Sequence, residues 1–525
     1  MGKGGQGEVK RALHFRTKEI RAIKAIDKSE IGKENWKMIV QEIDILREVD
    51  HPNIVKIFEF FESMTHFYIV MEFCHGKLLF QHFEGKKRVN EQEAAKIMVQ
   101  VLEALHYLHQ RKIVHMDLKS ENVIYNGRTV KLIDFGLSRH FKTNKKMKKV
   151  QGTKYYLAPE VITKQYNHKC DIWAAGVLLF MLLTGKTPFK GDSEGDLYNN
   201  ICQRKFDTKL EDVSGVSQKA KNLILLMMTQ DFKDRPEAVE ILKHVWLKGA
   251  SQYQNDRKSV ALIDNIKNLK FHNKLQRGIF YYFTNNLVTA QEHEKMSAAF
   301  KLLDKDRDGE LSREEFIEGL GGLGKKLSKE EIVRKFEMID TDNSNSVSYR
   351  EFVAGAFTKE EFLHGKRLRK LFKVIDVDNN NKISIQEFMI LFKKSEYITE
   401  EELKEIFKTA DQNSDGEIDF DEFKHFMRNM MTDFEFSSKQ MNYEELDNIG
   451  KSRMHSMFIG KKLNFKEENL EVIKENPRQS RKKNNGKTSS RKVQNPYKSE
   501  TPTSNKKISR KKNFRKRNGV QNIIK

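Results

Sequence analysis

Cysteine is scarce in this chain, and long apolar runs are missing. Only three of the 525 residues are cysteines, Cys74, Cys170 and Cys202. An odd, scattered set argues against a disulfide framework and for free thiols in a reducing compartment, which suggests a cytoplasmic protein. No segment approaches the roughly 18 apolar residues of a membrane-spanning helix. The first residues show no basic stretch followed by an apolar one, so we expect no secretory leader.

Acidic residues are nearly absent from one end of the chain, and this accounts for most of its charge. The formal net charge of +22 would by itself suggest a nucleic-acid-binding protein. Residues 477–525, however, contain 17 lysines and arginines and one acid, Glu500, and so contribute +16. The basicity belongs to a tail rather than to a binding face, and we expect no specific nucleic-acid partner.

The tail, residues 434–525, is polar and, taken as a whole, basic, which predicts disorder over residues 434–525. Its role stays open. One interpretation is a nuclear-localisation signal, and a second is contact with RNA or acidic lipid. A third is a solvated tail without a specific partner.

Hydrophobic periodicity divides the remainder of the chain into three parts. Residues 1–247 alternate strand-like runs such as "IRAIKAI" with helical periods such as "EAAKIMVQVLEALHYLHQ". Residues 248–289 form a basic, partly amphipathic junction. Residues 290–433 contain an internal repeat of 35 to 36 residues, which indicates four copies of one structural unit.

The first part begins with a glycine-rich loop. Gly2, Gly4, Gly7 and Val9 in "GKGGQGEV" have the spacing of a loop whose backbone amides approach nucleotide phosphates. Alone this pattern is weak. It gains weight from Lys24 in "AIKAI", which is suited to hold phosphate oxygens, and from Glu42 on a predicted helix, which can pair with Lys24. A surface charge is the alternative interpretation for Glu42.

A catalytic loop follows at "IVHMDLKSENV", and its residues fit phosphoryl transfer. The transition state spreads negative charge over the transferred group, so catalysis needs positioning and charge stabilisation. Asp117 would orient the substrate hydroxyl, and Lys119 would neutralise the γ-phosphate. Asn122 and Asp134 of "DFG" are the expected Mg²⁺ ligands. Six such elements occur in the expected order along the chain. Six unrelated surface charges would explain this order poorly.

These motifs resemble those of the eukaryotic protein kinases, over residues 1 to about 247, and "DLKSEN" with "GTKYYLAPE" resembles the serine/threonine branch. The resemblance implies a bilobal fold, ATP and Mg²⁺ as cofactors, and an ion pair between Glu160 and Arg235. It also implies that the adenine is contacted by four further residues, namely Ala22, the gatekeeper Met71, Glu72 and Cys74.

Two departures from the kinase pattern bear on activity. Met116 stands where many kinases have the arginine that grips a phosphorylated activation loop, so we expect control by another route. The chain also begins inside the glycine loop, so the first strand of the fold is nearly absent, which favours impaired nucleotide binding. A pseudokinase scaffold is therefore kept as the alternative to an active enzyme.

Four twelve-residue acidic loops fill the repeat region. Ca²⁺ prefers six to eight oxygens, supplied by side chains at loop positions 1, 3 and 5, a carbonyl at position 7 and a bidentate Glu at position 12. The predicted ligands are Asp304, Asp306, Asp308, Glu310 and Glu315 in loop one; Asp340, Asp342, Ser344, Ser346 and Glu351 in loop two; Asp376, Asp378, Asn380, Lys382 and Glu387 in loop three; and Asp411, Asn413, Asp415, Glu417 and Glu422 in loop four.

The flanks of these loops strengthen the interpretation, because a phenylalanine precedes each loop by four residues and another follows each position 12. This is a helix–loop–helix core repeated four times. Position 8 is always apolar, as pairing of two loops requires. Asn345 and Asn381 replace glycine at position 6, where a left-handed backbone is needed, and asparagine adopts it at some cost. We expect loops one and four to bind Ca²⁺ best.

The junction sequence "NIKNLKFHNKLQRGIFYYF" interleaves basic and apolar residues, as in a helix bound by a calmodulin-like domain. A helix packed permanently on the kinase is the alternative. A kinase, a basic helix and four EF-hands in this order resemble the calcium-dependent protein kinases. The resemblance implies an α+β fold comprising a bilobal kinase, an all-α calmodulin-like domain and a disordered tail. It also implies a monomeric enzyme that acts on protein Ser/Thr and that Ca²⁺ releases from inhibition by its junction.

Overall fold

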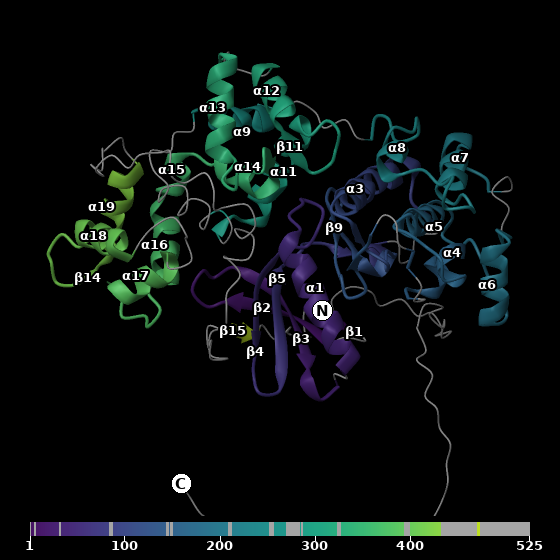
Figure 1. Ribbon diagram of the computed structural model, residues 1–525, viewed down its shortest axis with the longest axis horizontal. Coiled ribbons are helices and arrows are strands. Elements are labelled where there is room, and N and C mark those ends of the chain that lie inside the picture. Colours follow the sequence, from purple (N-terminus) through teal and green to yellow (C-terminus); the bar gives the residue numbers. More distant parts are fainter. Residues whose placement is uncertain are drawn as a thin grey trace, which may run out of the picture. The chain divides into compact units, whose positions relative to one another are not determined.

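Figure 1 shows the computed structural model of the chain, coloured from purple at the N-terminus to yellow toward the C-terminus. It describes residues 2–4, 7–30, 33–82, 88–142, 146–147, 151–207, 213–250, 257–268, 284, 287–322, 327–392, 400–431 and 470–472. Along the chain, a strand-rich lobe with one long helix is followed by a mainly helical lobe and then by paired EF-hand units. The predicted α+β class is confirmed.

The first lobe is built on an antiparallel sheet, drawn in purple in Figure 1. Its strands follow the order β1-β2-β3-β5-β4. Alternating apolar residues in β3 and β5 pack on the helix α1, whose Ile39 and Ile43 are buried. The elements are β1 (Gly2–Gly4), β2 (Gly7–His14), β3 (Ile20–Asp27), the 3₁₀ turn η1 (Lys28–Glu30), α1 (Lys33–Glu48), β4 (Ile57–Glu62) and β5 (His66–Glu72).

The second lobe is built around two largely buried helices. Every residue from Ala94 to His109 of α3 except Lys96, and nearly all of α5, is buried, as expected of helices at the centre of a lobe. Its elements are β6 (Lys77–Leu78), α2 (Leu79–His82), α3 (Glu91–Gln110), β7 (Ile113–Val114), η2 (Ser120–Asn122), β8 (Val123–Tyr125), β9 (Val130–Leu132), β10 (Arg139–His140), η3 (Lys154–Tyr156), α4 (Pro159–Ile162), α5 (Cys170–Thr184), α6 (Glu194–Cys202), α7 (Gln218–Met227) and α8 (Ala238–Leu242).

The repeat region forms four helix–loop–helix units in two pairs. The loop strands pair two by two, with Leu311 opposite Val347 and Ile383 opposite Ile418, so the predicted pairing at position 8 is confirmed. The elements are α11 (Ala290–Leu303), β11 (Glu310–Ser312), α12 (Arg313–Gly322), α13 (Lys329–Ile339), β12 (Ser346–Ser348), α14 (Tyr349–Ala356), α15 (Lys359–Phe362), α16 (Gly365–Ile375), β13 (Ile383–Ser384), α17 (Ile385–Phe392), α18 (Glu400–Ala410), β14 (Glu417–Ile418) and α19 (Phe420–Met431).

The phenylalanines that flank the loops form the cores of these pairs. All eight are buried, and they meet edge to face across each pair of units, an arrangement that aromatic rings prefer. The ring centroids are 5.4 Å apart for Phe300–Phe352, 5.6 Å for Phe316–Phe336, 5.5 Å for Phe372–Phe423 and 5.7 Å for Phe388–Phe407. Met427 and Met430 of "FMRNMM" are buried in the same core, which favours packing over an exposed target groove.

The junction is described only in part, as helix α9 (Arg257–Asn268). Ile263 and Ile266 are fully buried in one hydrophobic cluster with the EF-hand residues. The basic segment that we expected to be amphipathic lies mainly at 269–283, outside the described residues. Lys267 is described and is buried beside Asp264.

The tail contains one element that its composition did not predict. Residues 470–472 form the strand β15 (Leu470–Val472), which pairs antiparallel with Ala12, Leu13 and His14 of β2. The edge of β2 beyond β1 presents backbone groups that can pair with an extended segment, and these three residues occupy it. The remainder of 434–525 lies outside the described residues. Among those described, no helix is long and apolar enough to cross a membrane.

Candidate active site and calcium-binding loops

Lys24 forms the predicted ion pair with Glu42. Lys24 on β3 donates to both carboxylate oxygens of Glu42 on α1, at 2.7 and 2.9 Å, and its Nζ lies 3.7 Å from Asp134 Oδ1. Burial alone would lower the pKa of Lys24, but Glu42 and Asp134 raise it. Burial would raise the pKa of Asp134, whereas the Lys24 charge lowers it. Both shifts favour the charged forms, the Lys24 ammonium and the Asp134 carboxylate.

The catalytic loop centres on Asp117, which is held by three neighbours. Lys119 Nζ donates to its Oδ2 at 2.7 Å, and Asn122 Nδ2 donates to the same oxygen at 3.0 Å. Thr153 donates to Oδ1 from both its hydroxyl, at 2.7 Å, and its backbone N–H, at 3.1 Å. The sequence did not reveal this role of Thr153, since the residue lies 36 positions from Asp117. These hydrogen bonds fix the orientation of the Asp117 carboxylate.

The residues predicted to contact the nucleotide lie on neighbouring strands. Val9 is opposite Lys24 on β2 and β3, and Ala22 is opposite Met71 on β3 and β5. In the β1–β2 hairpin, Gly2 is opposite Val9 and Gly4 opposite Gly7. Only glycine suits position 7, where φ is +135° and a Cβ would lie 2.4 Å from the Ala25 carbonyl oxygen.

At the strand end that follows Met71, the structure adds a contact that the sequence did not reveal. The side chain of Glu72 accepts a hydrogen bond from Lys131 Nζ at 2.7 Å, so it is engaged with β9. Cys74 is buried, and burial raises the pKa of its thiol. This thiol is therefore an apolar wall rather than a reactive group.

Met116, the residue that departs from the kinase pattern, is buried in the second lobe. Its φ is +70°, and its sulfur lies 3.9 Å from Cys170 Sγ. The backbone N–H groups of His115 and Met116 donate to Asp171, at 2.8 and 2.9 Å. The backbone of the catalytic loop is thus anchored independently of the side chain at position 116. An apolar thioether there offers no charge to a phosphorylated loop.

The predicted ion pair of Glu160 and Arg235 is confirmed. It is bidentate, with N–O distances of 2.5 and 3.0 Å, and both side chains are buried. Arg235 also donates to the carbonyl oxygens of Thr229 and Lys169. Because the guanidinium is fully satisfied, the pair fixes the end of the activation segment against the helical lobe.

The calcium-binding loops share one geometry. In every loop the first Asp accepts from the backbone N–H of position 6, at 2.9 to 3.2 Å. Position 6 is left-handed in each, with φ of +83°, +61°, +65° and +84° at Gly309, Asn345, Asn381 and Gly416. Asparagine thus adopts the conformation that the sequence required of it. In loops one to three, oxygens of positions 1, 3 and 12 lie within 4.8 Å of one another, which fits the oxygen set that Ca²⁺ prefers.

Electrostatics in these loops reflect gathered carboxylates. Burial, together with the charges of Asp308 and Glu103, raises the pKa of Asp304 to about 8. Burial and Asp342 raise the pKa of Glu351 to about 7. A divalent cation would relieve this repulsion, so the residues present fit Ca²⁺.

Contacts between the kinase and the EF-hand region are a feature that sequence reasoning missed. Lys301 on α11 donates to Glu103 on α3 at 2.8 Å, and both side chains are buried. Arg111 forms an ion pair with Glu310 of loop one. The backbone N–H of Arg350 donates to Asp50 at 2.7 Å. Each partner looks like an ordinary surface charge in the sequence, and nothing local identifies the pairing.

Known protein families match the two regions of the chain separately. Residues 1–247 match the protein kinase domain, and residues 293–356 and 366–428 match the EF-hand domain pair. The chain is 37% identical over 329 residues to calcium-dependent protein kinase 4 of Plasmodium berghei and of Plasmodium falciparum. It is 35% identical over 338 residues to calcium-dependent protein kinase 3 of Plasmodium yoelii yoelii.

These matches cover 61–62% of this chain and 62% of each relative, so the chain spans about three fifths of the length of the curated relatives that it matches. The kinase motifs, the four loops and their order along the chain agree with the domain matches. In these features, the chain is similar to the calcium-dependent protein kinases.

Proposed function

We propose that this chain is a Ca²⁺-activated serine/threonine protein kinase that transfers the γ-phosphate of ATP to protein substrates. The observation that carries the proposal is the joint placement of Lys24, Glu42 and Asp134 with the hydrogen-bonded Asp117, Lys119 and Asn122. A protein kinase domain implies ATP and typically Mg²⁺, and EF-hands imply Ca²⁺.

In this proposal each side chain performs one task. Lys24, held by Glu42, binds phosphate oxygens. Asp134 and Asn122 would hold Mg²⁺, which neutralises phosphate charge when bound. Asp117 orients the substrate hydroxyl and accepts its proton, and Lys119, 2.7 Å from Asp117, stabilises the negative charge of the transferred group.

Regulation in this proposal runs through the EF-hands. The burial of Ile263 and Ile266 of α9 among EF-hand residues supports capture of the junction by the calmodulin-like domain. Ca²⁺ in the loops would stabilise the arrangement that holds the junction and leaves Asp117 accessible to substrate. The buried thioether of Met116 supports control by Ca²⁺ rather than by a phosphorylated activation loop. We infer that the enzyme acts as a monomer.

The test is phosphate transfer from ATP to a pool of basic Ser/Thr peptides, with Ca²⁺ and with a chelator. Asp117→Asn keeps the size of the side chain but removes its base, and serves as the blank. We expect transfer only with Ca²⁺, reduced in D117N by about a hundred-fold or more.

The alternative is a calcium-responsive pseudokinase scaffold, and ATP–Mg²⁺ binding separates the two. A scaffold would show Ca²⁺ binding without transfer in either state and would bind nucleotide weakly. Equal transfer with Ca²⁺ and with chelator would keep the enzyme but reject the switch.

A further inference from the structure

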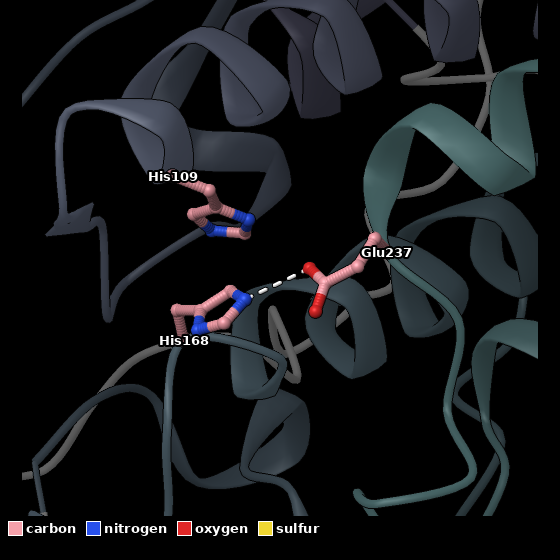
Figure 2. Close-up of side chains that lie close together, drawn as sticks. All are labelled: His109, His168 and Glu237. Carbon is pink, nitrogen blue, oxygen red and sulfur yellow. Dashed lines mark hydrogen bonds and ion pairs between the residues drawn. The ribbon is translucent and has the colours of Figure 1, made fainter. Parts of the chain in front are cut away.

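Away from the active site and the EF-hands, three side chains converge in the helical lobe. His109 lies near the end of α3, His168 lies between α4 and α5, and Glu237 directly precedes α8. One potential ligand atom of each lies within 4.8 Å of the others. Figure 2 shows the two imidazole rings and the carboxylate facing one another from these three segments.

The tautomer of His109 follows from its neighbour. Asp171 is 1% exposed and accepts from the backbone N–H groups of His115 and Met116. It also lies 2.9 Å from His109 Nε2. A carboxylate held by donors requires the proton of the His109 imidazole to be on Nε2, so Nδ1 carries a lone pair. Within the described part of the chain, this buried Nδ1 has no hydrogen-bond partner.

A buried imidazole nitrogen with a lone pair and no donor is costly unless something binds it. A carboxylate on the opposite nitrogen is the usual arrangement behind metal-binding histidines, because it fixes the ring and makes the free nitrogen more basic. The Asp171–His109 pair therefore provides one oriented nitrogen ligand.

The second imidazole is oriented by stacking. The His168 ring packs on Phe141, with centroids 4.6 Å apart and planes 15° apart, and meets the His109 ring at 4.8 Å. Its Nε2 lies 2.8 Å from Glu237 Oε2. The side chains of His168 and Glu237 are 16% and 38% exposed, so the cluster is open to water on the side of Glu237.

Two imidazoles, one carboxylate and a water fit a tetrahedral zinc site. Neutral nitrogen ligands favour zinc, cobalt or nickel over Ca²⁺ and Mg²⁺, which prefer oxygen. An ion would replace the hydrogen bond between His168 and Glu237, and the ligand atoms would move closer, since zinc bonds of about 2.0–2.2 Å place ligands roughly 3.3 Å apart. Lys169 Nζ, 3.5 Å from Glu237 Oε1, opposes binding, but it also donates to the Arg235 carbonyl oxygen at 2.6 Å and is held there.

We propose that His109, His168 and Glu237 form a binding site for a zinc-class divalent transition-metal ion that links α3, the segment before α5 and the start of α8. The site is separate from the Ca²⁺ loops and from the Mg²⁺ ligands. Its role is to stabilise the helical lobe beside Asp171, which anchors the catalytic loop. The proposal does not depend on kinase activity.

The test uses the full chain, saturated with Ca²⁺ so that the EF-hands are occupied, and titrates Co²⁺ as a spectroscopic substitute for Zn²⁺. We expect the visible absorption of tetrahedral Co²⁺ with nitrogen and oxygen ligands, at one ion per chain, displaced by Zn²⁺. At a hundred-fold excess of Zn²⁺ over its Kd, we expect the unfolding temperature of the kinase part to rise by roughly 5 °C.

Matched variants locate the site. His168→Gln and Glu237→Gln should each remove the signal and the thermal shift. His140→Gln, which alters an exposed histidine paired with Glu48, should leave both unchanged. Cys202→Ser tests for thiolate binding and should also have no effect. Since Glu237 is partly exposed, E237Q is expected to fold even if H168Q does not. Absence of the Co²⁺ signal in the wild type, or its survival in E237Q, would overturn the proposal.

Discussion

Loops one and four of the EF-hand region follow the same twelve-residue pattern, yet they lie in different surroundings. Both have glycine at position 6 with a φ near +84°. A Cβ added at Gly309 in loop one would lie 2.5 Å from Tyr107 and 2.8 Å from His51, both kinase residues, whereas one added at Gly416 in loop four would meet nothing within 4 Å. The local sequence enables a loop to bind Ca²⁺. The tertiary contacts of that loop decide whether Ca²⁺ binding can affect another part of the chain.

The largest expected effect comes from removing the bidentate ligand. Glu315→Gln and Glu422→Gln should each weaken Ca²⁺ binding in their own loop by on the order of a hundred-fold, because each loses a charged ligand. Only E315Q should strongly raise the Ca²⁺ concentration needed for phosphate transfer, since loop one contacts the kinase. Calorimetric Ca²⁺ titration and the transfer assay measure both quantities. An equal shift in E422Q would contradict the special position of loop one.

Next in size is the buried contact before loop one. Lys301→Met leaves Glu103 buried without this donor, which should cost about 1.5–3 kcal/mol of unfolding free energy. Lys305→Met is the matched control, because its pair with Glu318 is largely exposed and should contribute less than about 1 kcal/mol. Urea unfolding of the Ca²⁺-loaded chain compares the two. If K301M and K305M lower the free energy of unfolding equally, the contact of Lys301 with Glu103 does not couple the EF-hand region to the kinase region.

A matched glycine pair separates backbone strain from contact with the kinase. Gly309→Ala and Gly416→Ala should both weaken Ca²⁺ binding in their loops by about 1–2 kcal/mol, since alanine resists a left-handed backbone. Only G309A should also loosen the contact with α3, seen as faster amide hydrogen exchange around Tyr107. An unchanged rate of amide hydrogen exchange in G309A would mean that loop one does not contact α3 in solution.

The smallest effect concerns position 7, where the ligand is a backbone carbonyl. Glu310→Gln keeps that carbonyl but weakens the ion pair with Arg111, whose side chain is 23% exposed. The loss should be about 0.2–1 kcal/mol. Glu417→Gln, which alters the pair with Lys382 inside the EF-hand region, is the control. The Ca²⁺ dependence of transfer should shift slightly in E310Q only, and a shift in E417Q of the same size would remove the distinction between the loops.

Sequence alone determined what depends on neighbours within a few residues. The expected loop ligands and the left-handed Asn345 and Asn381 are set within twelve-residue segments, because backbone conformation and short-range hydrogen bonds are local. The apolar residue at position 8 of each loop indicated that the loops pair, although Leu311 and Val347 lie 36 positions apart. The pair of Lys24 and Glu42 was also predictable, since motif order along the chain indicates it.

Only the tertiary structure decided the contacts between distant segments. Lys301 meets Glu103 across 198 positions and Arg111 meets Glu310 across 199, and His168 meets Glu237 across 69. From the sequence alone, a charged or imidazole side chain can equally face solvent or contact another residue. The folded structure decides which, because burying an unpaired polar group is costly. Such a group therefore needs a partner wherever the packing of helices has removed water.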